Sequence, residues 1–181
     1  MRPRCPNIVL IGFMGTGKTV LGRTLAALIG YLFRDCDSLI EKAERKSITK
    51  IFLDEGEGYF RRREAETLRR LLGLRKVVIS SGGGIVLLEE NRRRLKKKAL
   101  VIWIKASQAT LRRRLSRCTN RPLLCVKDRA KQIRTLMKMR ERLYRSCADV
   151  TVRNDHATTV KALSQVMQKL KAHGIHVTHP R

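Results

Sequence analysis

Aromatic residues, acidic residues and long apolar runs are all scarce in this chain of 181 residues. Phenylalanine, tryptophan and tyrosine make up only 4% of it, so there is no sign of the aromatic platforms on which single-stranded nucleic acids stack. No apolar run approaches the ~20 residues that a membrane-spanning helix needs, and we expect no membrane segment. A charged and then apolar leader is also missing, so we expect no secretory signal.

The cysteines form no Cys-x-x-Cys motif. They are five in number and lie far apart along the chain. This pattern argues against a disulfide framework and against a zinc site, and it favours reduced thiols in a cytoplasmic protein. We assign the cysteines, Trp103 and the four histidines to packing or to the end of the chain.

The shortage of acidic side chains leaves a large positive charge. The chain has 41 lysines and arginines but 15 aspartates and glutamates, which gives a formal charge of +26. One interpretation is a surface that binds phosphate chains non-specifically, because strong positive charge attracts them whatever the fold. The other is a solvated basic surface with no partner. With so few aromatics, we expect no dedicated nucleic-acid partner.

What the sequence does contain is a phosphate-binding motif close to its start. Gly12, Gly17, Lys18 and Thr19 satisfy G-x-x-x-x-G-K-[ST], between a β-branched run and a helix-like pattern. Glycines let backbone N–H groups turn towards an anion, and the following helix adds its positive end. The motif predicts Lys18 on the β- and γ-phosphates and Thr19 on Mg²⁺, whereas the alternative is a chance glycine-rich turn. The residues expected to contact ATP here are Gly15, Thr16, Gly17, Lys18, Thr19 and Val20.

Strand-like and helix-like segments alternate along the rest of the chain. We expect strands over 8–11, 31–35, 76–80, 100–104 and 149–152. We expect helices over 18–30, 38–56 with a short second helix over 48–53, 59–72 after a break at 56–58, 108–117, 128–147 and 160–170, and either a helix or a turn over 91–98. The segments 76–80 and 100–104 are nearly all apolar, as in parallel sheets covered on both faces. The pattern predicts a single three-layer α/β domain over 1–181, with a mobile tail after the last helix.

Polar residues gather where these strands end, which is where such sheets bind ligands. Asp35 and Asp37 would point the same way if the strand persists, so that one holds the Mg²⁺–nucleotide and the other accepts a proton. The alternative is that they cap the following helix. Gly82, Gly83 and Gly84 follow the third strand, and they permit either close approach of a polar ligand or a flexible turn.

Two arginines lie on apolar helix stripes, where a guanidinium must find an anionic partner. Arg61 and Arg140 can each form a structural ion pair, for instance Arg61 with Glu64, or they can clamp a carboxylate substrate together. Arg121 lies in a loop after a helix. It is placed either as a lid arginine that reaches the transferring phosphate or as one more basic surface residue.

Together these motifs resemble the shikimate kinase family over about residues 7–152. The resemblance rests on GFMGTGKT (12–19), FRDCD followed by IE (33–41), IFLDEGEGYFRRRE (51–64), SGGG (81–84), RPLL (121–124) and RERLYRSCADVTV (140–152). It implies a three-layer α/β/α fold with a five-stranded parallel sheet, of the nucleoside-monophosphate-kinase type, and a lid at about 118–127.

The resemblance also implies transfer of the ATP γ-phosphate to the 3-hydroxyl of shikimate, in aromatic amino-acid biosynthesis, with Mg²⁺ and by a monomer. The expected shikimate contacts are Asp37, the candidate base, with Arg61, Gly82, Gly83, Gly84 and Arg140. Lys18 and Arg121 match positions that stabilise the γ-phosphate, and Thr19 and Asp35 match the Mg²⁺ positions. Arg114 matches a position that packs on adenine, and Glu64 one that orients the Arg61 region. The rivals are a gluconate or nucleoside-monophosphate kinase, and a nucleic-acid-binding protein built on an inactive kinase fold.

Overall fold

Five parallel strands form the centre of the fold in the computed structural model, which describes residues 7–116, 118, 121–155 and 158–175. The strands are β1 (Asn7–Ile11), β2 (Leu32–Asp35), β3 (Val77–Ser80), β4 (Ala99–Lys105) and β5 (Val150–Arg153). Their order in the sheet is β2-β3-β1-β4-β5. The predicted five-stranded parallel sheet is therefore confirmed, and every predicted strand is present within a residue or two of its expected bounds.

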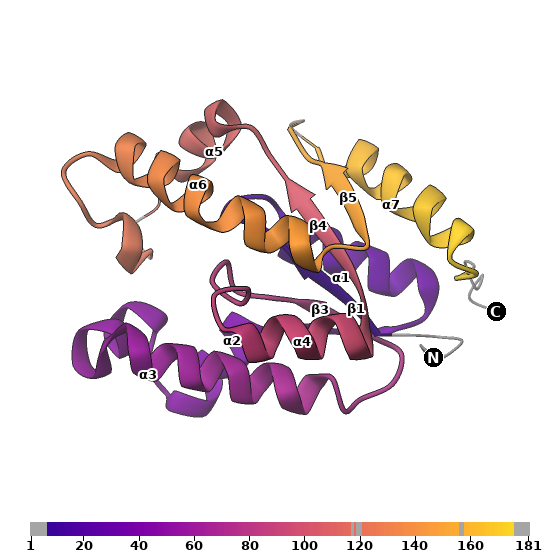
Figure 1. The fold of residues 1–181 in the computed structure, drawn as a ribbon, viewed down its shortest axis with the longest axis horizontal. Coiled ribbons are helices and arrows are strands. Elements are labelled where there is room, and N and C mark those ends of the chain that lie inside the picture. Colours follow the sequence, from indigo (N-terminus) through magenta and orange to yellow (C-terminus); the bar gives the residue numbers. More distant parts are fainter. Residues whose placement is uncertain (1–6, 117, 119–120, 156–157, 176–181) are drawn as a thin grey trace.

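Helices cover both faces of this sheet, as the apolar composition of the inner strands requires. Figure 1 shows α3 (Ile48–Leu71), α4 (Glu89–Lys98) and α6 (Arg129–Cys147) across one face. Helices α1 (Lys18–Ile29) and α7 (Val160–Ala172) pack on the other face. Each face has its own apolar cluster, and all five residues of β1 are buried between the two.

The strand order places a crevice at the carboxyl end of β1. From β1 the chain crosses to β2 at one edge of the sheet and later returns to β4 on the opposite side of β1. Connections that leave a central strand in opposite directions open a crevice beyond its carboxyl end, where ligands of such folds bind. The loops after β1, β2 and β3 all meet there.

Two helices follow β2, as predicted, and the second begins at the expected residue, Ile48, but it continues far beyond the expected end at residue 53. Helix α2 (Cys36–Glu44) ends early, and α3 begins after Ser47, whose hydroxyl accepts a hydrogen bond from the Lys50 amide. The predicted break at 56–58 is a kink at Gly56 alone, where φ is +78°. Glycine adopts this conformation without the penalty that a Cβ would bring, so α3 changes direction and continues to Leu71.

The predicted lid is described from residue 121 onwards and at residue 118. It contains a short 3₁₀ helix, Pro122–Leu124, and α5 (Gln108–Leu115) precedes it. Residues 117, 119 and 120 and the predicted mobile tail from residue 176 lie outside the described residues. Within the described ranges, no helix is both long and apolar enough to span a membrane.

Candidate active site

The loop after β1 folds around the side chain of Lys18. Gly12, Gly15 and Gly17 all have positive φ, which favours glycine, and a Cβ on Gly12 would lie 2.3 Å from the Ile104 carbonyl oxygen. The Lys18 Nζ donates to the Gly12 and Phe13 carbonyl oxygens at 2.9 and 3.0 Å. The loop is thus an ordered cradle with a cation inside, which rules out the chance glycine-rich turn.

Burial disfavours the charged form of the Lys18 side chain. This side chain is buried, and burial lowers the pKa of Lys18 to about 8, against the opposing effect of the Asp37 carboxylate. The N-terminus of α1, which begins at Lys18, has no side-chain cap among the described residues. A buried cation and free N–H groups at a positive helix end both favour an anion such as a phosphate.

Thr19 and Asp35 lie next to this cradle and contact each other. The Thr19 hydroxyl donates to Asp35 Oδ2 at 2.8 Å and lies 3.3 Å from the Ser80 hydroxyl. Asp35 Oδ1 also accepts from the Ser38 amide at 3.2 Å, so Asp35 caps α2 as the alternative interpretation had it. Capping uses one carboxylate oxygen and leaves the other beside the Thr19 hydroxyl, so the two roles are compatible.

Asp37 reaches the same crevice, but for a different reason from the one expected. The strand does not persist past Asp35, and Asp37 lies in the first turn of α2 instead. Its Oδ2 faces Arg121 Nη1 at 3.5 Å, while Oδ1 is buried without a partner among the described residues. Burial, and next the Asp35 charge, raise the pKa of Asp37. Asp37 is therefore more basic than an ordinary carboxylate.

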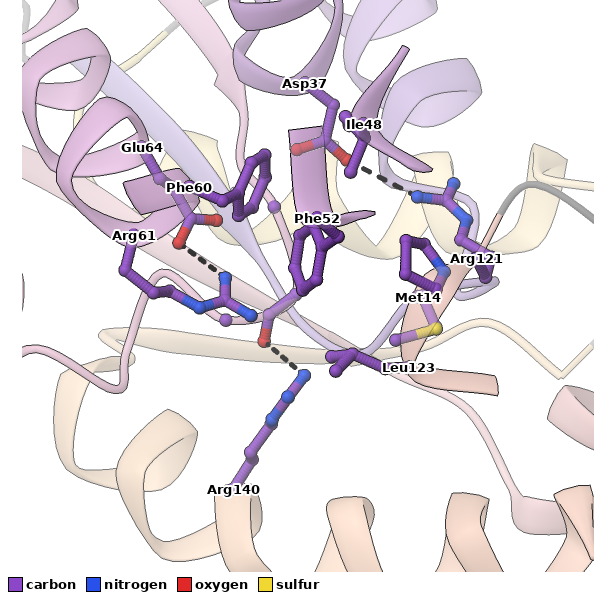
Figure 2. A pocket seen from close by; sticks show the side chains of 14 residues that line it. Met14, Asp37, Ile48, Phe52, Phe60, Arg61, Glu64, Arg121, Leu123 and Arg140 are labelled. Carbon is purple, nitrogen blue, oxygen red and sulfur yellow. Dashed lines mark hydrogen bonds and ion pairs between the residues drawn. The ribbon is translucent and has the colours of Figure 1, made fainter. Parts of the chain in front are cut away.

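A second cavity opens beside Asp37, and Figure 2 shows its lining. Asp37, Arg61, Glu64, Arg121 and Arg140 converge on it from α2, α3, α6 and the predicted lid. The cavity at the phosphate loop lies next to this pocket, and Asp37 and Arg121 line both of them. A group bound in one space can therefore meet a phosphate bound in the other.

The three glycines after β3 form the floor of this pocket and leave no room for side chains. A Cβ on Gly82 would lie 2.2 Å from Glu64 Oε1, and one on Gly84 would lie 2.0 Å from Arg61 Nη1. The Gly83 carbonyl accepts from Arg140 Nη1 at 3.2 Å and from the Tyr144 hydroxyl. The segment is a tightly packed backbone surface, so the flexible-turn interpretation is wrong.

The two inward arginines differ in their partners. Arg61 donates to Glu64 Oε2 at 2.8 Å and to Glu57 Oε1 at 2.8 Å, so the ion pair considered from the sequence is present. Arg140 is 2% exposed and forms no ion pair with a carboxylate of the described residues. Its Nε has no hydrogen-bond partner there either. Arg140 is thus the guanidinium left with unused capacity for an anion.

One wall of the pocket is apolar and was not assigned from the sequence. It is formed by Met14, Ile48, Phe52, Phe60 and Leu123. The kink at Gly56 brings Phe52, before it, and Phe60, after it, to the same pocket, with ring centroids 5.0 Å apart. The signal was available, because a glycine inside an amphipathic helix implies a change of direction.

On the far side of the phosphate loop, a third cavity is lined by residues from three separate parts of the chain. Arg114 donates to the Gly15 carbonyl at 3.1 Å, and Val20 and Thr159 line the same space. Asn154, also missed from the sequence, is fully buried there and donates to the Thr16 carbonyl at 2.8 Å. It directly follows β5, so the rule about strand ends could have found it.

The residues assigned to packing divide into two groups. Trp103, Cys36 and Cys147 are buried, and Trp103 stacks on Tyr144 with ring centroids 5.7 Å apart. Cys125 is exposed, so its assignment to packing is wrong. Cys5 and three of the histidines, namely His156, His176 and His179, lie outside the described residues.

Known proteins resemble this chain in sequence and in overall structure. The family model described as shikimate kinase matches residues 14–171. A shikimate kinase from Thioalkalivibrio sulfidiphilus is 41% identical over 160 residues, covering 88% of this chain and 84% of the relative. The solved shikimate kinase from Acinetobacter baumannii in complex with shikimate is 36% identical, with a TM-score of 0.90 over 92% of this chain and 93% of that one. A gluconokinase structure from Sinorhizobium meliloti, 18% identical with a TM-score of 0.59 over 94% of each chain, shares the fold alone.

Proposed function

Because this chain belongs to the shikimate kinase family, and is an ATP-dependent kinase by that membership, we propose that the crevice described above transfers the γ-phosphate of ATP to the 3-hydroxyl of shikimate. The observation that carries the assignment of residues is the convergence of Arg140, a buried cation without a carboxylate partner, with Asp37 and Arg121 at the edge of the phosphate loop. Shikimate has one carboxylate, which Arg140 could bind, and hydroxyl groups, one of which could face Asp37 and Arg121.

ATP would lie across the phosphate loop. The triphosphate would occupy the cradle of Gly15, Thr16 and Gly17, with Lys18 against the β- and γ-phosphates. Adenine would enter the cavity beside Arg114, which Val20 and Asn154 also line. Binding of a polyanion would favour the charged form of Lys18, whose pKa burial lowers to about 8.

Mg²⁺ would be held by Thr19 and Asp35 together with the phosphates. These two side chains offer a hydroxyl and a carboxylate within 2.8 Å of each other, the hard oxygen donors that Mg²⁺ prefers. The described residues contain no cluster of three or more His, Cys, Asp and Glu side chains that would form a cage of their own. That is expected of a site where the nucleotide completes the coordination. When bound, the ion neutralises charge on the phosphates.

Shikimate would enter the pocket with its carboxylate on Arg140 and its ring against the apolar wall. Arg61 would add a second positive group, already oriented by its pair with Glu64. The glycine backbone at 82–84 lines the pocket and would contact the ring hydroxyls.

In the transfer itself, the oxygen of the 3-hydroxyl would bond to the γ-phosphorus while Asp37 accepts the hydroxyl proton. The bond between the γ-phosphorus and the oxygen that bridges it to the β-phosphate would break, and ADP would leave. Lys18 and Arg121 would balance the charge on the phosphoryl oxygens. The residues act mainly by position and charge, as in other phosphoryl transfers. We further propose that the protein acts in the cytoplasm as a monomer, as the cysteine pattern and the resemblance led us to expect.

The rival acceptors are separated by a direct assay. ADP release is coupled to a visible readout, with Mg²⁺-ATP and either shikimate, gluconate or a nucleoside monophosphate. Turnover that depends on shikimate and disappears in Lys18→Ala supports the proposal. Turnover with another acceptor alone would overturn it, and so would ATP binding without any turnover, the behaviour of an inactive binding protein.

A further inference from the structure

The large positive charge is left unexplained by phosphate transfer, and its distribution is uneven. Nine of the 15 acidic residues lie between residues 35 and 66, where they pair with cations such as Lys46, Arg61 and Arg63. Between residues 129 and 147, which form α6, the only acidic residue is Glu141. Part of the unbalanced positive charge is therefore concentrated on one surface helix, α6.

The cations of α6 form a stripe along its exposed side. Its members, spaced three or four residues apart, are Lys131, Arg134, Lys138, Arg142 and Arg145. Residues at this spacing lie on one face of a helix. The opposite face, with Ile133, Leu136 and Tyr144, is buried against the sheet and the predicted lid, so the stripe points away from the active site.

This stripe is not explained by the stability of the helix. In the described part of the chain, only Arg145 among the five forms an ion pair, with Glu141 at 3.2 Å. Like charges three or four residues apart destabilise a helix. Lys131 also lies in the first turn of α6, where the helix dipole disfavours cations and where the one acidic side chain nearby is that of the capping residue, Asp128.

We propose that the α6 stripe binds the phosphate backbone of nucleic acid without sequence preference. From Lys131 to Arg145 the helix rises about 21 Å at 1.5 Å per residue. One strand of a duplex presents about six phosphates over that length, at 3.4 Å each, so five cations match its charge. Helix α5, which packs on the first half of α6, carries two more exposed cations, Arg112 and Arg113.

The composition of this face favours nucleic acid over other anionic partners. An acidic protein would need apolar or aromatic anchors at the centre of the interface, and the exposed side of α6 offers only Met139. An anionic membrane would hold an amphipathic helix by its apolar face, which α6 buries inside the protein. No exposed aromatic lies on α6 for base stacking, which is why binding should not depend on sequence.

The test compares two triple variants that remove the same charge from different helices. Arg134→Gln, Lys138→Gln and Arg142→Gln remove three cations from α6. Lys161→Gln, Lys169→Gln and Lys171→Gln remove three exposed cations from α7 on the opposite face. Fluorescence anisotropy with a labelled 20-nucleotide single strand and a 20-base-pair duplex, each in two unrelated sequences, gives Kd between 50 and 200 mM salt.

We expect the α6 variant to lose at least tenfold in affinity at 50 mM salt and the α7 variant less than twofold. The slope of log K against log salt should fall by about 2 for the single strand in the α6 variant, because each lost phosphate contact contributes about 0.7. Equal losses in both variants would mean that net charge alone binds, and would overturn the proposal. So would tight binding to anionic vesicles with none to either oligonucleotide. Shikimate-dependent turnover should be unchanged in both variants, which separates this proposal from the one for the active site.

Discussion

Arg140 and Arg61 line the same pocket, yet their replacement by methionine should have opposite consequences. Arg140 has no carboxylate partner among the described residues, whereas Arg61 pairs with Glu64, a side chain with no exposed surface. Methionine is chosen because it fills a similar volume without charge. We expect Arg140→Met to abolish most shikimate binding with little change in stability, and Arg61→Met to destabilise the fold.

The magnitude for Arg140 follows from its surroundings. Loss of a buried partner for a carboxylate typically costs 2–5 kcal/mol of binding, or roughly 30-fold to a few thousand-fold in Kd. In the Arg140→Met variant without ligand, the hydrogen bond that Arg140 donates to the Gly83 carbonyl is lost, but the Tyr144 hydroxyl still donates to that oxygen. Removing a buried unpaired charge offsets part of the loss, since such a charge is itself costly. The free energy of unfolding should therefore change by no more than about 1 kcal/mol.

The magnitude for Arg61 comes from the carboxylate it leaves behind. Breaking a buried ion pair by removing one partner costs about 3–5 kcal/mol. For a chain of this size, each kcal/mol shifts the melting temperature by roughly 2–4 °C, so Arg61→Met should melt about 6–20 °C lower. Burial already raises the pKa of Glu64, and without Arg61 that carboxyl group should take up a proton on folding.

Calorimetric titration with shikimate and thermal melts of the free protein measure both effects. The control is Arg145→Met, because Arg145 lies on α6 like Arg140 but is exposed. It should change neither the shikimate affinity nor the melting temperature appreciably. Unchanged shikimate affinity in Arg140→Met would remove Arg140 from the pocket. A melting temperature as low as that of Arg61→Met would show that Arg140 is a structural residue, contrary to the reasoning from its missing partner.

Three further outcomes can be checked on the same protein. Asp37→Asn should lower kcat by roughly 10²–10⁴ and leave ATP affinity nearly intact in a nucleotide titration, whereas equal losses in both would contradict a role as base. Gly82→Ala should weaken shikimate binding and lower stability by about 1–3 kcal/mol in the same titrations and melts, because its methyl group would meet Glu64 Oε1 at 2.2 Å; wild-type values would contradict the close packing. Lys18 has a pKa lowered to about 8 by burial, so its destabilising charge is fully present below pH 8 and is lost as pH rises towards 10.5. Between pH 7 and 9.5 the free wild type should therefore gain about 2 kcal/mol relative to Lys18→Met in chemical denaturation, and no relative gain would contradict the burial of a charged Lys18.

The sequence was sufficient for the sheet and for the residues at the strand ends, because those depend on local pattern. The phosphate loop needs a strand, three glycines and a helix in immediate succession, and all of these are adjacent in the chain. Arg61 and Arg140 were identified as inward by the stripes around them, and both are buried. A single helical period therefore predicted two residues of the pocket without any tertiary information.

The rest depended on geometry that short-range patterns do not contain. The Arg61–Glu64 pair is local to α3 and was among the alternatives from the sequence, but the lack of a carboxylate partner for Arg140 depends on how α6 packs on the glycine turn, where Arg140 donates to the Gly83 carbonyl. The roles of Phe52 and Phe60 depend on the single kink at Gly56, which the sequence predicted as a longer break. Asp37 was expected at the end of a strand, but α2 starts at Cys36, two residues before the predicted start at 38, so Asp37 lies in the first turn of a helix at the crevice.

On the proposed function, the charge of the pocket itself would explain how a chain with a charge of +26 selects one small anion. Three arginines and two carboxylates line the acceptor pocket, namely Arg61, Arg121 and Arg140 against Asp37 and Glu64, which gives it a formal charge of +1. A ligand with a single carboxylate neutralises that charge, whereas a more highly charged anion would leave a surplus in a partly enclosed space where electrostatic effects are large. If shikimate binds as proposed, the paired residues would keep the local charge equal and opposite to that of the substrate, and Arg140, which lacks a carboxylate partner among the described residues, would supply the attraction. On the proposed function, discrimination in this pocket would therefore depend on Glu64 as much as on the arginines, although Glu64 would repel the ligand that it helps to select.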